Sequence, residues 1–237
     1  MLQDGSPRDA AYGDSSPLFD GGKSDWIFSI TTISTPHLGA SLADLVFDVD
    51  IDRPLQMFVV GLSSFLNLFG SWGSDLYDLK MEQWGIEQRK IDESLLEYAT
   101  KAYNLGIFDQ HWHDTALYDL SLEGSEEFNE WATLNGNIYY FSYASSDSRE
   151  SWTFSWSSFS WKRIHVPNTL TMTTFMQMLS YMAGSRFTAD DCGLGDTWLE
   201  NDGAANTIST IGPASSTDPV VPFDGQVRPN VWNYMGT

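Results

Sequence analysis

The sequence predicts an α/β fold in which helices flank a mainly parallel sheet. Two apolar stretches have the composition of buried strands, residues 26–33 (WIFSITTI) and residues 138–144 (IYYFSYA). A helical run and a turn precede the second stretch, and the order helix, turn, strand is typical of parallel sheets. With 237 residues, of which 42% are hydrophobic, the chain can bury one sizeable core. We therefore expect a single domain over residues 1–237.

Each predicted element has a local signal. Aromatic and β-branched residues predict the first strand, and the segment TPHLG (residues 35–39) ends it. The helical run begins near Ser125 and lasts to the turn at residues 135–137. Asp92 can cap a further short helix. Residues 151–161 (SWTFSWSSFSW) alternate aromatic and polar side chains, which predicts an exposed or half-buried strand.

Two apolar stripes at helical spacing, within residues 55–69 and 172–182, each fit two roles. The first stripe fits a core helix or a lid over an apolar pocket, and the pattern alone favours the core. The second fits core filling, which we favour, or a flexible wall for an acyl chain. Their members are Leu55, Phe58, Val59, Leu62, Phe65, Leu66 and Phe69 in the first stripe and Met172, Phe175, Met176, Leu179 and Met182 in the second.

The net charge of −20 argues against several partners. Nucleic acids and anionic membrane surfaces attract clustered Lys and Arg, whereas this chain has 32 acidic and 12 basic residues. No apolar run reaches 18 residues, so the sequence predicts no transmembrane helix. The polar first 25 residues lack the apolar region of a signal peptide. Cys192 is the only cysteine, so no internal disulfide is expected.

Chemical motifs are few. The sequence contains no GxSxG, P-loop, GxGxxG, HExxH or EF-hand pattern, and its histidines are His37, His111, His113 and His165. The cluster HWHD (residues 111–114) fits two or three metal ligands or, as we favour, a polar loop. The tryptophans Trp152, Trp156 and Trp161 fit a sugar platform, an interface wedge or, as we favour, a loop pinned by its own aromatics.

Asp202 lies in the turn ENDG (residues 200–203), directly before a short apolar run. An acid in this place can orient a histidine and stabilise the imidazolium during proton transfer. It can equally cap its own backbone in an Asx-turn. Composition leaves both possibilities open.

Six stretches resemble one family, the large bacterial lipases of the α/β-hydrolase fold, which has thermostable and staphylococcal members. They occur in the family's order and approximate spacing, from about residue 15 to the end of the chain. The stretches are SITTISTPHLG (29–39), LYDLKMEQWGI (76–86), HDTALYDLSLEGSEEFNEW (113–131), IYYFSYA (138–144), TWLENDGAANTIS (197–209) and STDPVVPFDGQVRPNVWNYMGT (216–237).

The resemblance implies an incomplete α/β-hydrolase fold with a lid-like helical insertion at about residues 40–72, which favours the lid for the first stripe. Asp202 matches the acid of a Ser-Asp-His triad, and Asp114 matches one ligand of a structural zinc ion. His37 would be structural and near the pocket. The resemblance further implies an extracellular, secreted enzyme that hydrolyses long-chain acylglycerol esters at the lipid–water interface.

No residues of this sequence match the triad serine, the triad histidine or the other zinc ligands. An internal calcium position falls at residues 168–171, where the match is poor, so calcium is expected only in a full-length protein. We therefore expect this chain alone to be inactive and its shortened sheet to expose an unpaired edge. Two alternatives remain: a non-catalytic relative that binds lipid or protein, and a carbohydrate-binding module that uses the three tryptophans.

Overall fold

The computed structural model describes residues 17, 20–48, 116–185, 190, 192–213 and 218–237. Its strands are β1 (Ser29–Ile33), β2 (Tyr139–Tyr143), β3 (Ser148–Ser155), β4 (Ser160–Pro167), β5 (Val220–Pro222) and β6 (Trp232–Tyr234). Its helices are η2 (Ser24–Trp26), α2 (Ser41–Asp48), α5 (Ala116–Asp119), α6 (Leu122–Trp131), α7 (Thr174–Ala183), η4 (Asp196–Trp198) and α9 (Thr207–Thr210).

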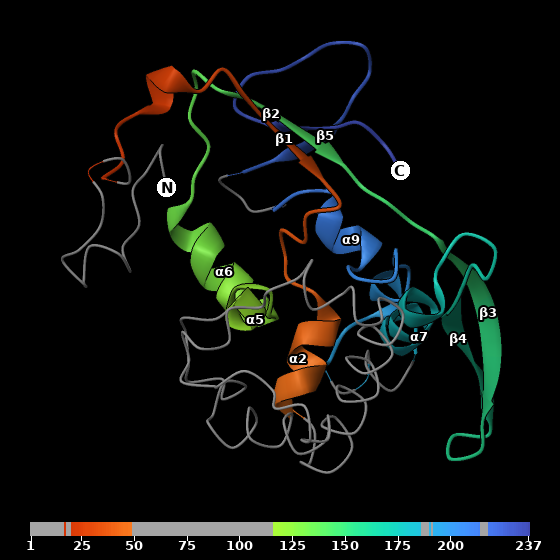
Figure 1. Ribbon diagram of the computed structural model, residues 1–237. Coiled ribbons are helices and arrows are strands. Elements are labelled where there is room, and N and C mark those ends of the chain that lie inside the picture. The colour runs from red at the N-terminus through yellow and green to blue at the C-terminus, as the bar shows by residue number, and fades with distance from the viewer. Residues whose placement is uncertain (1–16, 18–19, 49–115, 186–189, 191, 214–217) are drawn as a thin grey trace, which may run out of the picture.

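A four-stranded sheet in the order β1-β2-β6-β5 forms the centre of the fold. All three neighbouring pairs are parallel, and the β1–β2 register runs from Ser29 opposite Tyr139 to Ile33 opposite Tyr143. This confirms the predicted parallel sheet. Because the strands are parallel, their carboxyl ends meet at one edge, and Figure 1 shows β1 and β2 ending side by side.

The first predicted strand is shorter and more exposed than expected. Residues 24–26 form the 3₁₀ helix η2, and the strand begins only at Ser29. The side chains of Trp26, Phe28 and Ile33 are 68%, 78% and 73% exposed. The prediction of a buried strand was wrong because β1 is the outer strand of the described sheet, where one side has no described neighbour.

The core lies around the second predicted strand, whose position is confirmed. Ile138, Tyr140 and Trp232 are almost fully buried and are packed against the partly buried Ile30 and Val220. The ring centroids of Tyr140 and Trp232 lie 5.2 Å apart, so the aromatic side chains of β2 and β6 interlock across the parallel pair. Burial on this strand explains why its apolar run predicted it so clearly.

Helix α6 begins earlier than the sequence predicted. Its N-cap is Ser121, whose hydroxyl accepts a hydrogen bond from the Gly124 amide at 3.0 Å, and the helix ends at Trp131. A Cβ on Gly124 would lie 2.0 Å from the carbonyl oxygen of Tyr118, so glycine is needed where α5 meets α6. The predicted start near Ser125 was wrong because Ser121 supplies the capping oxygen four residues earlier.

The predicted lid insertion at about residues 40–72 is described only at its beginning. There α2 packs beside α6, with the Ala40 amide bonded to the Leu120 carbonyl at 2.8 Å and the Leu122 amide bonded to Asp44 at 3.0 Å. The first apolar stripe and the helix predicted at Asp92 lie outside the described residues. Within the described part, no helix is both long and apolar enough to cross a membrane.

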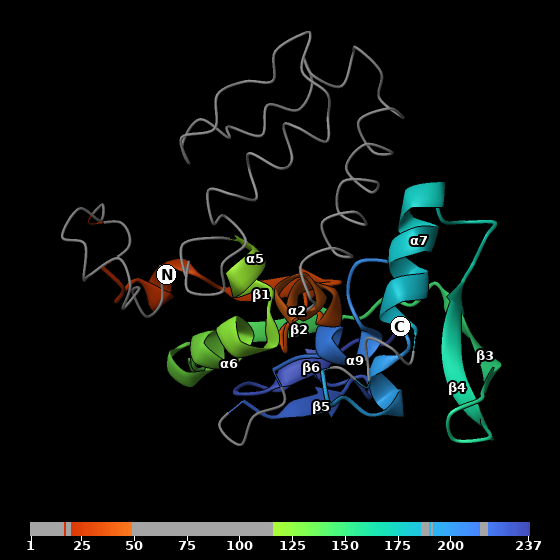
Figure 2. The same ribbon diagram turned by 90° about the horizontal axis from the view of Figure 1, so that it is seen from below.

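Strands β3 and β4 form a separate antiparallel hairpin. The strand predicted over residues 151–161 is therefore confirmed for residues 151–155 and wrong for residues 156–159, where the chain turns, and the favoured loop holds only for this turn. Figures 1 and 2 show this hairpin at one side of the molecule, with α7 against it and the parallel sheet further away. The amide of His165 donates to the carbonyl of Gly184 at 2.8 Å. A Cβ at position 184 would lie 2.3 Å from the His165 carbonyl oxygen, so the glycine permits the close packing of α7 on β4.

Candidate active site

Asp202 lies in a tight loop between η4 and α9. The loop is closed by an isolated antiparallel bridge between Asn201 and Asn206 and by a 3.1 Å hydrogen bond from the Asp202 amide to the Ala205 carbonyl. Gly203 has φ +99°, a backbone conformation that side-chain-bearing residues rarely adopt. The sequence ENDGAAN therefore places a glycine where the backbone needs one and polar residues on both sides of it.

The two carboxylate oxygens of Asp202 have different surroundings. Oδ1 accepts hydrogen bonds from the amides of Ala204 and Ala205, both at 2.9 Å. Oδ2 accepts from the Ser145 hydroxyl at 2.5 Å. Since a carboxylate has about four acceptor positions, the described residues fill three of them and leave one on Oδ2. The side chain is half-buried, so Oδ1 forms the expected Asx-turn while Oδ2 can still accept another donor.

Two serines connect this carboxylate to the carboxyl ends of β1 and β2. Ser34 follows β1, Ser145 follows β2, and their hydroxyl oxygens lie 2.5 Å apart. Because the Ser145 proton is directed at Asp202, Ser34 is the donor to Ser145. The Ser34 amide also bonds to the Tyr143 carbonyl at 2.9 Å, which holds the two strand ends together. Asp202 therefore lies at the carboxyl edge of the parallel sheet.

The sequence analysis did not identify Ser34 and Ser145. A signal was present, because each serine comes directly after a predicted strand, at the end where side chains of parallel strands converge. The last residues of the chain also reach this edge, since the Ala144 amide donates to the Gly236 carbonyl at 3.1 Å. Figure 1 shows the C-terminus close to the point where β2 ends.

Two buried asparagines fix the loop that carries Asp202. Asn201 is fully buried, and its side-chain nitrogen Nδ2 donates to the carbonyls of Leu199 at 2.9 Å and Ser180 at 3.2 Å. Its side-chain oxygen accepts from the Gly203 amide at 3.0 Å. Asn206 accepts from the Ser41 amide at 2.9 Å, so the loop is held by α7 on one side and by α2 on the other.

His165 joins the hairpin to the same loop. The backbone amide of Asn201 donates to the Ser148 hydroxyl at 3.0 Å, and that hydroxyl lies 3.0 Å from Nδ1 of His165. Burial lowers the pKa of His165, while the carboxylates of Glu200 and Glu150 oppose that shift. The contact between Nδ1 and the Ser148 hydroxyl fastens β4 to the loop that carries Asp202.

His37 is packed as a neutral side chain. Its Nε2 lies 3.0 Å from the Thr32 hydroxyl, and its ring meets Trp232 edge-on with centroids 4.6 Å apart. The Thr32 hydroxyl donates to the Phe141 carbonyl at 3.3 Å, so it accepts a proton from Nε2. Burial lowers the pKa of His37 to about 4. These contacts agree with the structural place that the resemblance implies.

The described residues offer no metal centre. Asp114, His111 and His113 lie outside them, and no group of three or more His, Cys, Asp or Glu side chains in the described part could hold a metal ion. The segment expected near a calcium ion is closed by its own hydrogen bonds. Asn168 and Thr171 donate to the two carboxylate oxygens of Asp147, at 2.9 Å and 2.5 Å.

The methionine stripe borders the Asp202 loop. Met172 is buried, whereas Met176, Leu179 and Met182 are only half-buried along α7. A Cβ at Gly203 would lie 2.9 Å from Cε of Met176, so α7 reaches the loop directly. The core role that we favoured holds for Met172, while the half-buried Met176 lies against the loop that carries the acid.

Comparison with known proteins shows that this chain is similar to bacterial lipases. The model of the family described as "Lipase-like, C-terminal domain" matches residues 2–236. The lipase of Staphylococcus hyicus is 29% identical over 241 residues, covering 100% of this chain and 33% of that lipase. A lipase of Staphylococcus epidermidis is 32% identical over 155 residues, covering 63% of this chain and 21% of that lipase.

Solved structures show the same similarity. EstA from Clostridium botulinum superposes with a TM-score of 0.69 at 32% identity, covering 99% of this chain and 52% of EstA. Lipase 1 from Pelosinus fermentans gives 0.66 at 32% identity and is covered over 59% of its chain. The S. hyicus lipase gives 0.63 at 29% identity and is covered over 56%. This chain thus spans about half of each solved chain and a third of the curated S. hyicus lipase.

Proposed function

Because this chain belongs to the family of lipase-like C-terminal domains, we propose that it works within a carboxylic ester hydrolase and supplies the acid of its catalytic triad. Its parallel sheet and flanking helices are part of an α/β-hydrolase fold, the fold class that the sequence predicts. Since the matched lipases are longer, the serine nucleophile and the histidine base would come from parts of the protein beyond this sequence.

The position of Asp202 carries this proposal. Ligand and catalytic sites of open α/β sheets lie outside the carboxyl ends of the strands, where the contact with Ser145 places this carboxylate. Two amide hydrogen bonds hold Oδ1 still, and one acceptor position on Oδ2 is left for an imidazole N–H. In this role Asp202 would fix the tautomer of the histidine and stabilise its charged form.

The chemical steps would follow those of other serine esterases. The histidine would remove the serine proton as the hydroxyl attacks the ester carbonyl, and would then protonate the leaving alcohol. Asp202 would stay ionised throughout.

We propose long-chain acylglycerol esters as the substrates and the lipid–water interface as the place of reaction. The half-buried members of the methionine stripe support this, since flexible thioether chains adapt to an acyl chain beside the acid. The apolar stripe of residues 55–69 would act as the lid. An extracellular location and a zinc ligand at Asp114 remain proposals from the resemblance, and no catalytic step here depends on zinc.

Covalent titration with a phosphonate ester tests the proposal, because it labels only an activated serine. We expect the 237-residue chain by itself to stay unlabelled and the longer protein that contains it to be labelled. In that longer protein, Asp202→Asn should lower kcat by about 10⁴-fold, the effect seen when a triad acid is neutralised. Asp196→Asn, an exposed acid in the same segment, is the matched control and should leave kcat unchanged.

Two results would refute the proposal. Stoichiometric labelling of the 237-residue chain would mean that one of its own serines is the nucleophile. Full activity of the Asp202→Asn protein would mean that another residue orients the histidine. Lipid binding without labelling of either protein would instead favour a non-catalytic relative.

A further inference from the structure

The tip of the β3–β4 hairpin exposes a group of large aromatic side chains. Trp156, Phe159 and Trp161 are 81%, 77% and 66% exposed, and Trp152 on the same hairpin is 53% exposed. We call Trp156, Phe159 and Trp161 the aromatic tip. Figures 1 and 2 show the hairpin extending away from the body of the described fold. Exposed aromatics gathered in one place mark a surface that binds something.

The aromatic tip is held in one shape. Phe154 lies at its centre, with ring centroids 5.1 Å from Trp156, 5.4 Å from Phe159 and 5.5 Å from Trp161, all edge-to-face. Phe159 has φ +49°, an uncommon conformation for a bulky residue. The hairpin ladder continues without a gap up to Ser155 opposite Ser160. The rings are therefore kept outward by a regular scaffold, and little side-chain freedom would be lost on binding.

The base of the hairpin is attached to the Asp202 loop. The Asp147 amide donates to the Asn201 carbonyl at 3.1 Å, and the Asn201 amide donates to Ser148 at 3.0 Å. At the other strand, β4 packs against α7 through His165 and Gly184. In Figure 1 the chain passes from the end of β2 directly into β3, on the carboxyl-end side of the sheet. A surface bound by the tip would therefore lie at a fixed position relative to the candidate active site.

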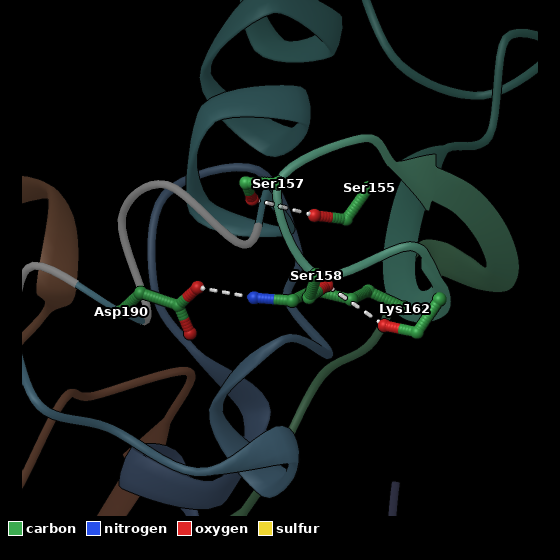
Figure 3. A network of polar contacts seen from close by, with 6 residues as sticks. Ser155, Ser157, Ser158, Lys162 and Asp190 are labelled. Carbon is green, nitrogen blue, oxygen red and sulfur yellow. Dashed lines mark hydrogen bonds and ion pairs between the residues drawn. The ribbon is translucent and has the colours of Figure 1, made fainter.

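The charge around the aromatic tip differs from that of the whole chain. Residues 151–189 contain no Asp or Glu, although the chain has 32 of them and a net charge of −20. The hydroxyls of Ser155 and Ser157 bond to each other at 3.0 Å, as do those of Ser158 and Ser160 at 2.8 Å. Figure 3 shows these pairs and Lys162, whose ammonium points sideways to Asp190 at 3.1 Å. The tip itself is uncharged, so it can leave water at low cost.

We propose that the aromatic tip inserts into the lipid–water interface and anchors the protein there. Tryptophan suits the interface because its indole has an apolar body and one polar N–H. A sugar platform would need polar side chains that hydrogen-bond the sugar beside the ring, whereas here the rings pack against Phe154 and the neighbouring serine hydroxyls bond to each other in pairs. The choice of lipid as partner rests on the proposed function.

Sedimentation of the 237-residue chain with sucrose-loaded dioleoylphosphatidylcholine vesicles tests the anchor without any catalytic step. The triple variant Trp156→Ser, Phe159→Ser, Trp161→Ser should bind at least about tenfold more weakly, since each aromatic side chain buries on the order of 150–250 Å². The matched control is Trp26→Ser with Phe28→Ser, which removes two equally exposed aromatics outside the hairpin and should bind like the unmodified chain.

Trp156→Phe sharpens the test. Phenylalanine keeps the apolar contact, so vesicle binding should persist, while quenching of tryptophan fluorescence by brominated lipid should drop. Trp156→Ser alone serves if the triple variant fails to fold by circular dichroism, and it should weaken binding severalfold. Addition of phosphatidylglycerol should not strengthen binding, because the tip is uncharged.

Three outcomes would overturn the proposal. Unchanged vesicle binding by both serine variants would place the lipid contact elsewhere. Quenching of Trp156 by cellohexaose would identify the tip as a sugar site. Self-association that the triple variant abolishes would identify it as a contact between copies of the chain. Because vesicle binding needs no triad, a longer protein that binds vesicles but stays unlabelled would contradict only the proposed esterase.

Discussion

The Asp202 loop and the β3–β4 hairpin, whose base is attached to that loop, show opposite kinds of construction. In the loop, irregular backbone and two buried asparagines hold a single carboxylate, and nearly every polar atom has its own partner. In the hairpin, a regular ladder holds large apolar side chains in water. The contrast indicates that placing one atom requires a specific hydrogen-bond network, whereas presenting a surface requires only a rigid scaffold.

Within the Asp202 loop, replacement of Asn201 should produce the largest loss of stability. Asn201→Ala removes three hydrogen bonds of a buried side chain and leaves the Leu199 carbonyl and the Gly203 amide without this partner, which should cost about 3–5 kcal/mol of unfolding free energy. Urea unfolding followed by circular dichroism measures this cost. Asn137→Ala, at an exposed asparagine, should stay within about 0.5 kcal/mol. Equal urea midpoints for the two variants would mean that Asn201 contributes no more to stability than an exposed asparagine does.

Acid should destabilise the sheet edge next to the loop through His37. Its pKa is about 4 in the folded protein and 6.5 in its ordinary state, so the unfolded chain binds the proton more strongly. The contribution of the neutral His37 to the free energy of unfolding is then fully present above pH 6.5. It falls by about 3 kcal/mol as the pH drops from 6.5 to 4.

His37→Gln isolates this effect, because other titrating groups contribute equally to both proteins. Glutamine can still donate to Thr32, so the difference in unfolding free energy between the two proteins should change with pH only between 6.5 and 4. A difference that stays constant over this range would mean that His37 is not buried as a neutral imidazole.

Substitution of Gly203 tests whether the Asp202 loop tolerates a change in its backbone. Gly203→Ala forces a side chain into φ +99° and within 3.2 Å of the Met176 carbonyl, which should cost about 2 kcal/mol. The control is Gly195→Ala, since Gly195 has φ −84° and open space around its Cβ position. In the longer protein, Gly203→Ala should also lower kcat, because the carboxylate of the preceding residue, Asp202, would move. Similar stability of the two alanine variants would contradict a tightly fitted loop.

The smallest effect is expected at the hairpin. Trp156→Ala removes only edge contacts with Phe154 and Phe159 and should cost less than about 1 kcal/mol. Trp232→Ala removes the same residue type from the core and should cost about 3–5 kcal/mol. Thermal and urea unfolding compare the two. A large cost at Trp156 would mean that the tip supports the fold rather than a binding surface.

Local sequence signals predicted those elements whose stability is local or whose burial is continuous. The apolar run of β2, the alternation of β3 and the stripe of α7 correspond to observed elements. The burial of β1 could not be predicted, because exposure of an apolar strand depends on which strands flank it. The start of α6 was misplaced because Ser121 and Ser125 are both plausible caps, and only the contact with α5 distinguishes them.

For the candidate site, the sequence by itself determined that Asp202 lies in a turn between an asparagine and a glycine, directly before a short apolar run. It left open whether Asp202 caps the backbone or faces a partner, since both roles use the same residues. The tertiary structure decided that Oδ1 caps the backbone while Oδ2 faces a partner. It does so by bringing Ser145 and Ser34 from two distant strand ends to the loop. Such convergence depends on parallel strand register, which is set by contacts between segments more than a hundred residues apart and therefore has no local signal.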